Sequence, residues 1–355
     1  MSDSNSSVVQ SLEEHKQALA QIMTDLYFKN HPELVEEYGE KAKEKCYEDA
    51  IYHINYLGQA IRVDSQKIFN SYLDWARTML KERGEDVNDL IDNIKFLKKA
   101  IYQRIPRDEA SELTLYIDRG LAVLQNEEVK EQSFFQSGDP LVEEAQTYLD
   151  FLLSGKRTEA GEYIDKLVKE GVAIKDIYEH IFQKSQYEVG ALWQSNIISV
   201  AHEHYCTAAT QLIMSQLYPK IFSTKKKGYK LVACSVADEL HEIGIRMVAD
   251  FFEMEGWDTY YMGANMPAHN LVSAIKEYEA DVLAVSVTMP LHLDKAGKLI
   301  KTIRSDSEIN DLKILVGGYP FRIEPELWKK LGADGSATSA KEAIKLATKL
   351  STQKS

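Results

Sequence analysis

Four short apolar runs in the C-terminal third, each followed by a helical pattern, constrain the fold of this chain most strongly. They are KLVACSV at 230–236, residues 257–262, DVLAVSV at 281–287 and KILVGG at 313–318. Continuous apolar runs of this length are typical of strands buried on both faces of a parallel sheet. Their alternation with helices is typical of a doubly wound fold, and a short fifth strand is expected near residues 333–337. Residues 228–355 are therefore predicted to form a Rossmann-like α/β domain with a parallel sheet.

The rest of the chain shows helical spacing in two segments. Residues 1–128 are predicted to be all-helical, with Pro32 and Pro106 at helix boundaries and Asp64-Ser65 capping a helix between them. Residues 137–222 are predicted to form a four-helix bundle, which begins with a cap and a first-turn proline at Asp139-Pro140. The chain is thus expected to have three domains: 1–128, 137–222 and 228–355.

Composition excludes several classes of protein. A chain of 355 residues is too long for one compact core. The net charge of −13 disfavours a broad nucleic-acid surface. Three widely separated cysteines argue against a disulfide framework or a zinc site and favour a reducing compartment. No apolar run approaches the ~18 residues of a membrane span, and the polar N-terminus lacks signal-peptide features. A cytoplasmic protein without a membrane segment is expected.

A histidine motif, Glu239-Leu-His241-Glu-Ile-Gly244, directly follows the first apolar run. An imidazole there would lie at the carboxyl edge of the sheet, where open α/β sheets bind ligands. Glu239 is placed to accept the other ring N–H, as a carboxylate commonly does behind a metal-ligating histidine. Gly244 would let a bulky group approach the backbone. Taken alone, a histidine at a strand–helix junction is also typical of a capping or core residue.

The motif resembles the cobalt-binding signature of cobalamin (vitamin B12) binding domains, usually Asp-x-His-x-x-Gly, whose Glu variant is common in the light-sensing branch. Further matches follow in order at 261–267 (YMGANMP), Ser286-Val-Thr288 and Gly317-Gly318, so that the resemblance covers about residues 137–350. It implies that His241 is the lower axial ligand of cobalt, with Glu239 as its orienting partner and Gly244 beside the cofactor. It also implies a slot for the nucleotide tail, lined by Ser286, Thr288, Gly317 and Gly318.

A second constellation, Trp193-x9-Glu203-His204, lies in the last part of the predicted bundle. By itself it suits a core tryptophan and a surface Glu-His pair. Beside the C-terminal domain it is similar to the cap of adenosylcobalamin photoreceptors, which implies that Trp193 packs on the adenosyl group and that Glu203 and His204 act on the same face. Gln194 stands where the DNA-binding photoreceptors carry a cobalt-ligating histidine, so the upper ligand after illumination stays open.

The N-terminal segment shows no helix-turn-helix pattern. It is similar to the helical N-terminal regions of photocobilins, cobalamin photoreceptors that also bind biliverdin. That resemblance implies a linear tetrapyrrole near Cys46 and His53. The alternative is that these residues and the aromatic side chains around them fill a helical core; the aromatic residues are Tyr47, Tyr52, Tyr56, Phe69, Tyr72 and Trp75.

The resemblances imply a non-enzymatic light sensor. Adenosylcobalamin would be its cofactor and biliverdin a second chromophore, and photolysis of the Co–C bond would alter homo-oligomerisation or the binding of a separate protein partner. The alternative is a methyl-carrying corrinoid protein of a methyltransferase system, against which the Trp-x9-Glu-His set and the N-terminal segment argue. A scaffold that uses cobalamin only for stability is a third interpretation. The sequence names neither the partner nor the oligomeric states in the dark and in the light.

Overall fold

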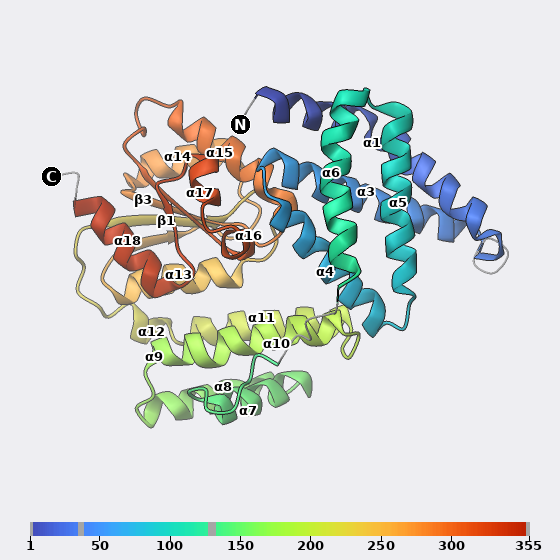
Figure 1. Cartoon of the computed structure of the whole chain (residues 1–355). Helices are drawn as coiled ribbons and strands as arrows, with labels where there is room; N and C mark the ends of the chain where they lie inside the picture. Colours follow the sequence, from blue (N-terminus) through green and yellow to red (C-terminus); the bar gives the residue numbers. More distant parts are fainter. Residues whose placement is uncertain (1–2, 35–38, 127–132, 353–355) are drawn as a thin grey trace. The chain divides into compact units, whose positions relative to one another are not determined.

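The computed structural model describes residues 3–34, 39–126 and 133–352 (Figure 1). The chain divides into two compact units. The first unit contains Met1–Glu128 together with Val287–Lys298 and Tyr319–Gly332. The second unit contains Val129–Ser286, Leu299–Gly318 and Ala333–Ser355. The first unit therefore combines the N-terminal helices with two short segments from the C-terminal part of the chain.

A five-stranded parallel sheet is the centre of the C-terminal part. Its strands are β1 (Lys230–Ser235), β2 (Asp258–Tyr261), β3 (Val282–Ser286), β4 (Lys313–Gly317) and β5 (Gly335–Ser336), in the order β2-β1-β3-β4-β5. Strands β1 to β4 lie within the four predicted apolar runs, and β5 lies within residues 333–337, where a fifth strand was expected, so the predicted parallel α/β fold is confirmed. The order reverses between β1 and β3, which is the place where doubly wound sheets bind ligands.

The register of the sheet aligns three strand ends. Ser235 of β1 pairs with Ser286 of β3, and Ser286 pairs with Gly317 of β4. These three residues consequently form a row at the carboxyl edge, next to the loop that carries the histidine motif. A shift of register by one residue would turn every side chain of a strand to the opposite face.

The helices of the C-terminal part alternate with the strands. They are α13 (Ile243–Met254), α14 (Ala268–Tyr278), the 3-10 turn η2 (Pro290–His292), α15 (Leu293–Arg304), α16 (Tyr319–Ile323), α17 (Leu327–Leu331) and α18 (Ala340–Thr352). Helix α13 buries two faces: Ala249 and Phe252 pack with the sheet, whereas Met247 and Phe251 join the core of the bundle. Because both faces are occupied, α13 holds the sheet and the bundle together inside the second unit.

The bundle consists of α7 (Val142–Leu153), α8 (Arg157–Lys169), α10 (Gln183–Gln194) and α11 (Val200–Gln216). The short elements α9 (Ile174–Asp176) and η1, a π-helical turn (Ile177–Phe182), lead into α10, and α12 (Tyr218–Ile221) follows α11. Four main helices were predicted, and four are present in this described segment. The predicted cap at Asp139 is wrong, because α7 begins only at Val142 and the Asp139 carboxylate accepts hydrogen bonds from the Gln136 N–H and from Lys184.

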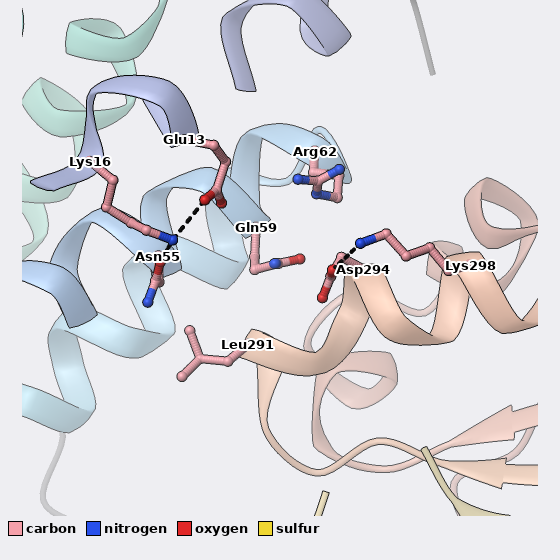
Figure 2. Close-up of a pocket in the computed structure, with 8 residues that line it drawn as sticks. All are labelled: Glu13, Lys16, Asn55, Gln59, Arg62, Leu291, Asp294 and Lys298. Atoms are coloured by element: carbon pink, nitrogen blue, oxygen red, sulfur yellow. Dashed lines mark hydrogen bonds and ion pairs between the residues drawn. The ribbon is translucent and has the colours of Figure 1, made fainter. Parts of the chain in front are cut away.

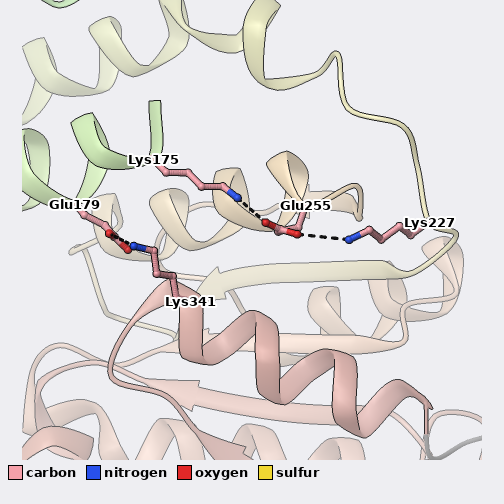
Figure 3. A network of polar contacts seen from close by, with 5 residues as sticks. All are labelled: Lys175, Glu179, Lys227, Glu255 and Lys341. Carbon is pink, nitrogen blue, oxygen red and sulfur yellow. Dashed lines mark hydrogen bonds and ion pairs between the residues drawn. The ribbon is translucent and has the colours of Figure 1, made fainter. Parts of the chain in front are cut away.

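Ion pairs join the bundle to the α/β part at its surface (Figure 3). Lys175 and Lys227 both contact the Glu255 carboxylate, at N···O distances of 2.5 and 3.4 Å, and Lys341 of α18 contacts Glu179 at 2.6 Å. Partly exposed pairs of this kind contribute about 0–1 kcal/mol each. The apolar core shared through α13 is therefore the larger source of stability between bundle and sheet.

The N-terminal helices of the first unit are α1 (Asp3–Asn30), α3 (Glu40–Arg62), α4 (Gln66–Glu82), α5 (Val87–Arg104) and α6 (Arg107–Leu124). Pro106 stands at the N-cap of α6, as predicted. Ser65 is at the N-cap of α4, but the predicted capping bond is absent, since its hydroxyl donates to Glu324 at 3.0 Å. Helices α4 and α6 cross closely at Gly120, where an added Cβ would lie 2.6 Å from a methyl carbon of Leu73.

The longest helices of the chain are amphipathic or charged. Within the described residues, no helix combines the length and apolar character that crossing a bilayer requires.

Candidate functional site

The histidine motif forms the loop that leaves β1 at the point where the strand order reverses. Glu239 is fully buried, and one of its carboxylate oxygens accepts hydrogen bonds from His241 Nδ1 at 2.6 Å and from the His241 backbone N–H at 3.1 Å. The Ser235 hydroxyl donates to the His241 carbonyl at 2.8 Å. With Nδ1 engaged, Nε2 is the ring nitrogen left for a ligand, and the imidazole is 61% exposed.

The charge on Glu239 also sets the protonation of this imidazole. Its hydrogen bond raises the pKa of His241 above the ordinary value and outweighs the opposing effect of burial. The Glu203 carboxylate of α11 raises the same pKa further. Because a metal ligand must be unprotonated at the coordinating nitrogen, a proton and a metal ion would compete for Nε2.

The loop after β2 is hydrogen-bonded to the motif loop. The Asn265 backbone N–H donates to the Glu239 carbonyl at 2.9 Å, and the Asn265 side-chain oxygen accepts from the Asp238 N–H at 2.8 Å. Asp238 and Asn265 both adopt positive φ angles, 67° and 51°. The segment 261–267, quoted above as a sequence match, thus supports the backbone around Glu239.

The cap constellation lies where the pattern predicted it. Trp193 is half-buried near the end of α10, a turn follows at Ser195 and Asn196, and Glu203 and His204 lie in the first turns of α11. The Glu203 carboxylate contacts the His204 ring and accepts from the Thr207 hydroxyl at 3.0 Å. Among the described residues no hydrogen bond or ring pair joins Trp193 to the motif loop.

One polar face of α11 is directed at the motif loop. Glu203, Thr207 and Gln211 are spaced four residues apart and therefore lie on one side of the helix. Gln211 donates to a carboxylate oxygen of Glu242 at 2.9 Å, and the other oxygen of Glu242 accepts from the Tyr261 hydroxyl at 2.8 Å. This Gln211–Glu242–Tyr261 bridge connects the bundle, the motif loop and the end of β2.

Sequence reasoning missed this bridge. Glu242 directly follows His241, and Gln211 falls eight residues after Glu203 on the same helical face, so both positions carried a signal. Their pairing needed the fold, since Gln211 and Glu242 are 31 residues apart in the chain.

The residues predicted to line the slot for the nucleotide tail are brought together only in part. Ser286 and Gly317 lie side by side in the row of strand ends, whereas Thr288 belongs to the first unit. Gly318 has a φ of 111°, which disfavours any side chain, and a Cβ on Gly317 would lie 3.3 Å from the Ala337 carbonyl oxygen. The chain's own geometry therefore accounts for both glycines, whether or not a ligand lies over them.

The surroundings of His241 leave room for a bulky group. A Cβ added to Gly244 would meet no atom within 4 Å, so the chain's own packing does not require glycine there. Leu240, next to the imidazole, is 72% exposed, and apolar side chains at the start of α11 and before it are exposed as well, namely Ile197 and Val200. A single exposed imidazole, three residues before a glycine with open space at its Cβ position, suits a metal that brings its own macrocycle.

A self-standing metal site is not found at His241. Within the described part of the chain, one group of three residues offers metal-ligating atoms close together: Asp176, Glu179 and His180. Glu179 in that group already contacts Lys341.

The N-terminal candidates lie in a helical core. Cys46 and His53 are both buried, and His53 Nδ1 lies 2.7 Å from the Tyr72 hydroxyl. Burial lowers the pKa of His53 to about 4 and raises the pKa of Cys46 to about 11, so both groups are uncharged at neutral pH. The Tyr72 ring stacks on Tyr56 with centroids 3.8 Å apart. Of the aromatic residues quoted above, Tyr52 stands out as 52% exposed.

Comparison with known proteins matches three segments of the chain to family models. Residues 229–345 match the model of the B12 binding domain, and residues 144–218 match a second B12 binding domain model. Residues 2–124 match a phycobilisome protein model. Two segments of the chain are therefore similar to B12 binding domains, and a helical segment similar to a phycobilisome protein precedes them.

Several named proteins are similar to the chain. A corrinoid protein of Desulfitobacterium hafniense (strain Y51) is 25% identical over 207 residues, which are 56% of this chain and 93% of the relative. Dimethylamine corrinoid protein 2 of Methanosarcina acetivorans is 26% identical over 206 residues, 57% of this chain and 93% of the relative. The solved structure of the Methanosarcina barkeri monomethylamine corrinoid protein shares the fold, with a TM-score of 0.53 and 20% identity, over 59% of this chain and 100% of the other.

Proposed function

We propose that this protein is a light sensor that holds adenosylcobalamin between the bundle and the sheet. The observation that carries the cobalamin-binding part of the proposal is the position of His241. Its imidazole is oriented by buried Glu239, and the Glu203 carboxylate of α11 lies near enough to raise its pKa. In this proposal the motif loop carries the cobalt ligand, and Glu203, one of the cap residues, lies near it on α11.

In this proposal each residue has a defined task. His241 Nε2 would hold the cobalt while Glu239 accepts the hydrogen bond from Nδ1–H. Trp193, Glu203 and His204 would contact the adenosyl group from the bundle, and Gly244 would leave space for the macrocycle. Bound adenosylcobalamin would supply a Co–C bond that light breaks. Ser286, Thr288, Gly317 and Gly318 would accommodate the nucleotide tail.

The bundle is the element that would respond to light. The Gln211–Glu242–Tyr261 bridge holds α11 to the motif loop through the hydrogen bond from Gln211 to Glu242, and a second hydrogen bond, from Tyr261, holds the same carboxylate to the end of β2. Loss of a ligand packed under the cap would change the relative stability of two arrangements of the bundle, which is a population shift. The proposed output is a change of homo-oligomeric state or of protein partner.

We propose the N-terminal segment as a second light-sensing module that holds biliverdin. Its similarity to photocobilins and the match of residues 2–124 to a phycobilisome protein model support this. The three model matches, at 2–124, 144–218 and 229–345, also support the division into domains at 1–128, 137–222 and 228–355. The filled core around His53 and Tyr72 argues for placing the chromophore outside that core.

The second candidate function is that of a methyl-carrying corrinoid protein with no catalytic activity of its own. The names of the relatives, corrinoid proteins that match 56–57% of the chain, back this function better than light sensing. The sensor is preferred here on the cap constellation and on the N-terminal segment, which a carrier does not need.

Reconstitution of the full chain with adenosylcobalamin tests the two functions directly. A sensor should show a spectral change and an altered molar mass, by size exclusion with light scattering, after green light. Trp193→Ala should weaken the preference for adenosylcobalamin, whereas Trp75→Ala, a half-buried tryptophan outside the cap, should not. Light breaks the Co–C bond of free adenosylcobalamin as well, so the spectral change shows only that photolysis has occurred. An equal mass in the dark and after complete photolysis would reject the change of oligomeric state and favour the carrier.

A separate titration with biliverdin tests the second chromophore. Specific binding should shift and sharpen the red absorption band at about one equivalent of full-length protein. A spectrum that remains that of free biliverdin at excess protein would reject the biliverdin site.

A further inference from the structure

A polar pocket lies in the first unit (Figure 2), and its lining includes no residue of the His241 loop. It has a volume of about 420 Å³ and is lined by three helices and the turn before one of them. The lining residues are Glu13 and Lys16 of α1, Asn55, Gln59 and Arg62 of α3, Leu291 of η2, and Asp294 and Lys298 of α15. All of them belong to the first unit.

Most charges around this pocket are already paired. Lys16 contacts Glu13 at 2.7 Å and donates to the Asn55 side-chain oxygen at 3.1 Å. Lys298 contacts Asp294 at 3.0 Å. Both carboxylates of the lining, Glu13 and Asp294, are thus paired with lysines, and Arg62 is the remaining basic residue.

Two buried polar atoms of the pocket wall have no partner. Gln59 is only 7% exposed, and its side-chain oxygen makes no hydrogen bond within the described residues. Arg62 Nε is buried and likewise makes none. A buried donor and a buried acceptor left unsatisfied are costly for the folded state, and such groups in a native pocket indicate a missing partner.

We propose that this pocket binds a small carboxylate that carries a hydrogen-bond donor close to the carboxylate group. The Arg62 fork matches the geometry of a carboxylate, and Gln59 needs an N–H or O–H from the same ligand. Three basic and two acidic residues line the pocket, so one negative charge balances it. A phosphate dianion would leave a negative excess in a half-enclosed site.

The site is built from two distant parts of the sequence. Helix α3 contributes Gln59 and Arg62, and Leu291 and Asp294 come from the segment that begins just after β3. A ligand held by both would add a cross-link inside the first unit. Its binding should therefore raise the thermal stability of the full chain, because a ligand that binds only the folded state stabilises it.

Three ligands of nearly equal size test the contributions of Arg62 and Gln59 separately. Lactate has the carboxylate and a hydroxyl donor, propionate lacks the donor, and lactamide lacks the charge. Full-length protein, in a buffer free of other carboxylates and of phosphate, is titrated with each by ligand-observed NMR and by thermal shift. Lactate should bind saturably, at least threefold more tightly than propionate and at least tenfold more tightly than lactamide. Inorganic phosphate should bind more weakly than lactate.

Two variants and a matched control complete the test. Arg62→Gln should weaken lactate binding at least tenfold, whereas Arg83→Gln, which removes an exposed charge at the end of α4, should change it less than twofold. Gln59→Leu keeps the arginine and should make lactate and propionate bind equally, so it decides the question even if the Arg62 variant does not fold. Absence of saturable lactate binding, or identical binding in parent and variants, would overturn the proposal.

Discussion

Replacement of Glu239 by Gln tests how the motif loop controls its histidine. The substitution keeps the size of a fully buried side chain. It leaves an oxygen that can still accept hydrogen bonds from His241 Nδ1, which lies 2.6 Å from the Glu239 carboxylate in the parent, and from the His241 backbone N–H. The substitution removes the negative charge and turns the second carboxylate oxygen into an NH2 donor. Any change in cobalamin binding then reports on these two differences.

The expected magnitude follows from the kind of hydrogen bond that is lost. A hydrogen bond to a charged group contributes about 1.5–3 kcal/mol and a neutral one about 0.5–1.5 kcal/mol, so the charge accounts for about 1–1.5 kcal/mol. Partners that orient a metal-ligating histidine typically change metal affinity by about 10–100-fold. Glu239→Gln should accordingly weaken histidine-ligated cobalamin binding by about tenfold.

The pH dependence gives a second, independent signature. Glu239 raises the pKa of His241, so the parent retains a proton at Nε2 up to a higher pH than an unperturbed histidine would. Cobalt ligation should strengthen as pH rises through that pKa, and in Glu239→Gln the transition should move to lower pH. The cofactor-free chain behaves oppositely: the stabilisation from protonated His241 is fully present below its unfolded pKa and is lost as pH rises through the raised folded pKa.

The assay is equilibrium dialysis of cobalamin across pH 5.5–8.5, with electron paramagnetic resonance of the cobalt(II) form to detect an imidazole nitrogen. Glu242→Gln is the matched control, because it neutralises a carboxylate in the same loop that contacts Gln211 and Tyr261 rather than the His241 ring. The control should alter retention without moving the pH midpoint. An unchanged affinity and an unchanged midpoint in Glu239→Gln would refute the reasoning.

Three further outcomes are expected. Trp193→Ala should lower selectivity for adenosylcobalamin over methylcobalamin by ~1–3 kcal/mol, measured as a ratio of dissociation constants, and an equal ratio in parent and variant would remove Trp193 from the site. Asp250 accepts from the buried Tyr178 hydroxyl at 2.8 Å, and burial raises its pKa to about 6. The folded state thus favours the protonated acid, and stability from this group falls as pH rises from 3.8 through 6. The difference between the two pKa values corresponds to about 3 kcal/mol. Asp250→Asn should therefore be more stable than the parent in urea unfolding at pH 8, by up to that amount, and should lose this advantage near pH 4. A stability difference that is the same at both pH values would contradict this. Glu255→Gln should lower the free energy of unfolding by less than about 1 kcal/mol, and this loss should shrink in high salt, because the contacts of Glu255 with Lys175 and Lys227 are partly exposed. A larger, salt-independent loss in urea unfolding would show that these ion pairs are more than surface contacts.

Helix ends show where local patterns fail. Ser65 and Asp139 are good capping residues by type, yet neither side chain caps the helix that follows it. Ser65 donates to Glu324, 259 residues away, and Asp139 pairs with Lys184, 45 residues away. A side chain chooses among all the partners that the fold brings near it, and a local pattern contains only the nearby ones.

The sequence by itself determined the parallel sheet, the helical segments before it and the local pair at the motif. Buried parallel strands need continuous apolar runs, and a carboxylate two residues before a histidine reaches it without help from the rest of the chain. Tertiary structure alone decided which residues oppose that pair. Glu203 and Gln211 come to the loop from α11, and the wall of the polar pocket joins Gln59 and Arg62 to Asp294, more than 200 residues further along. Such contacts depend on the packing of the helices and on the order of the strands. Both are decided by which surfaces the whole chain buries, and no single segment contains that information.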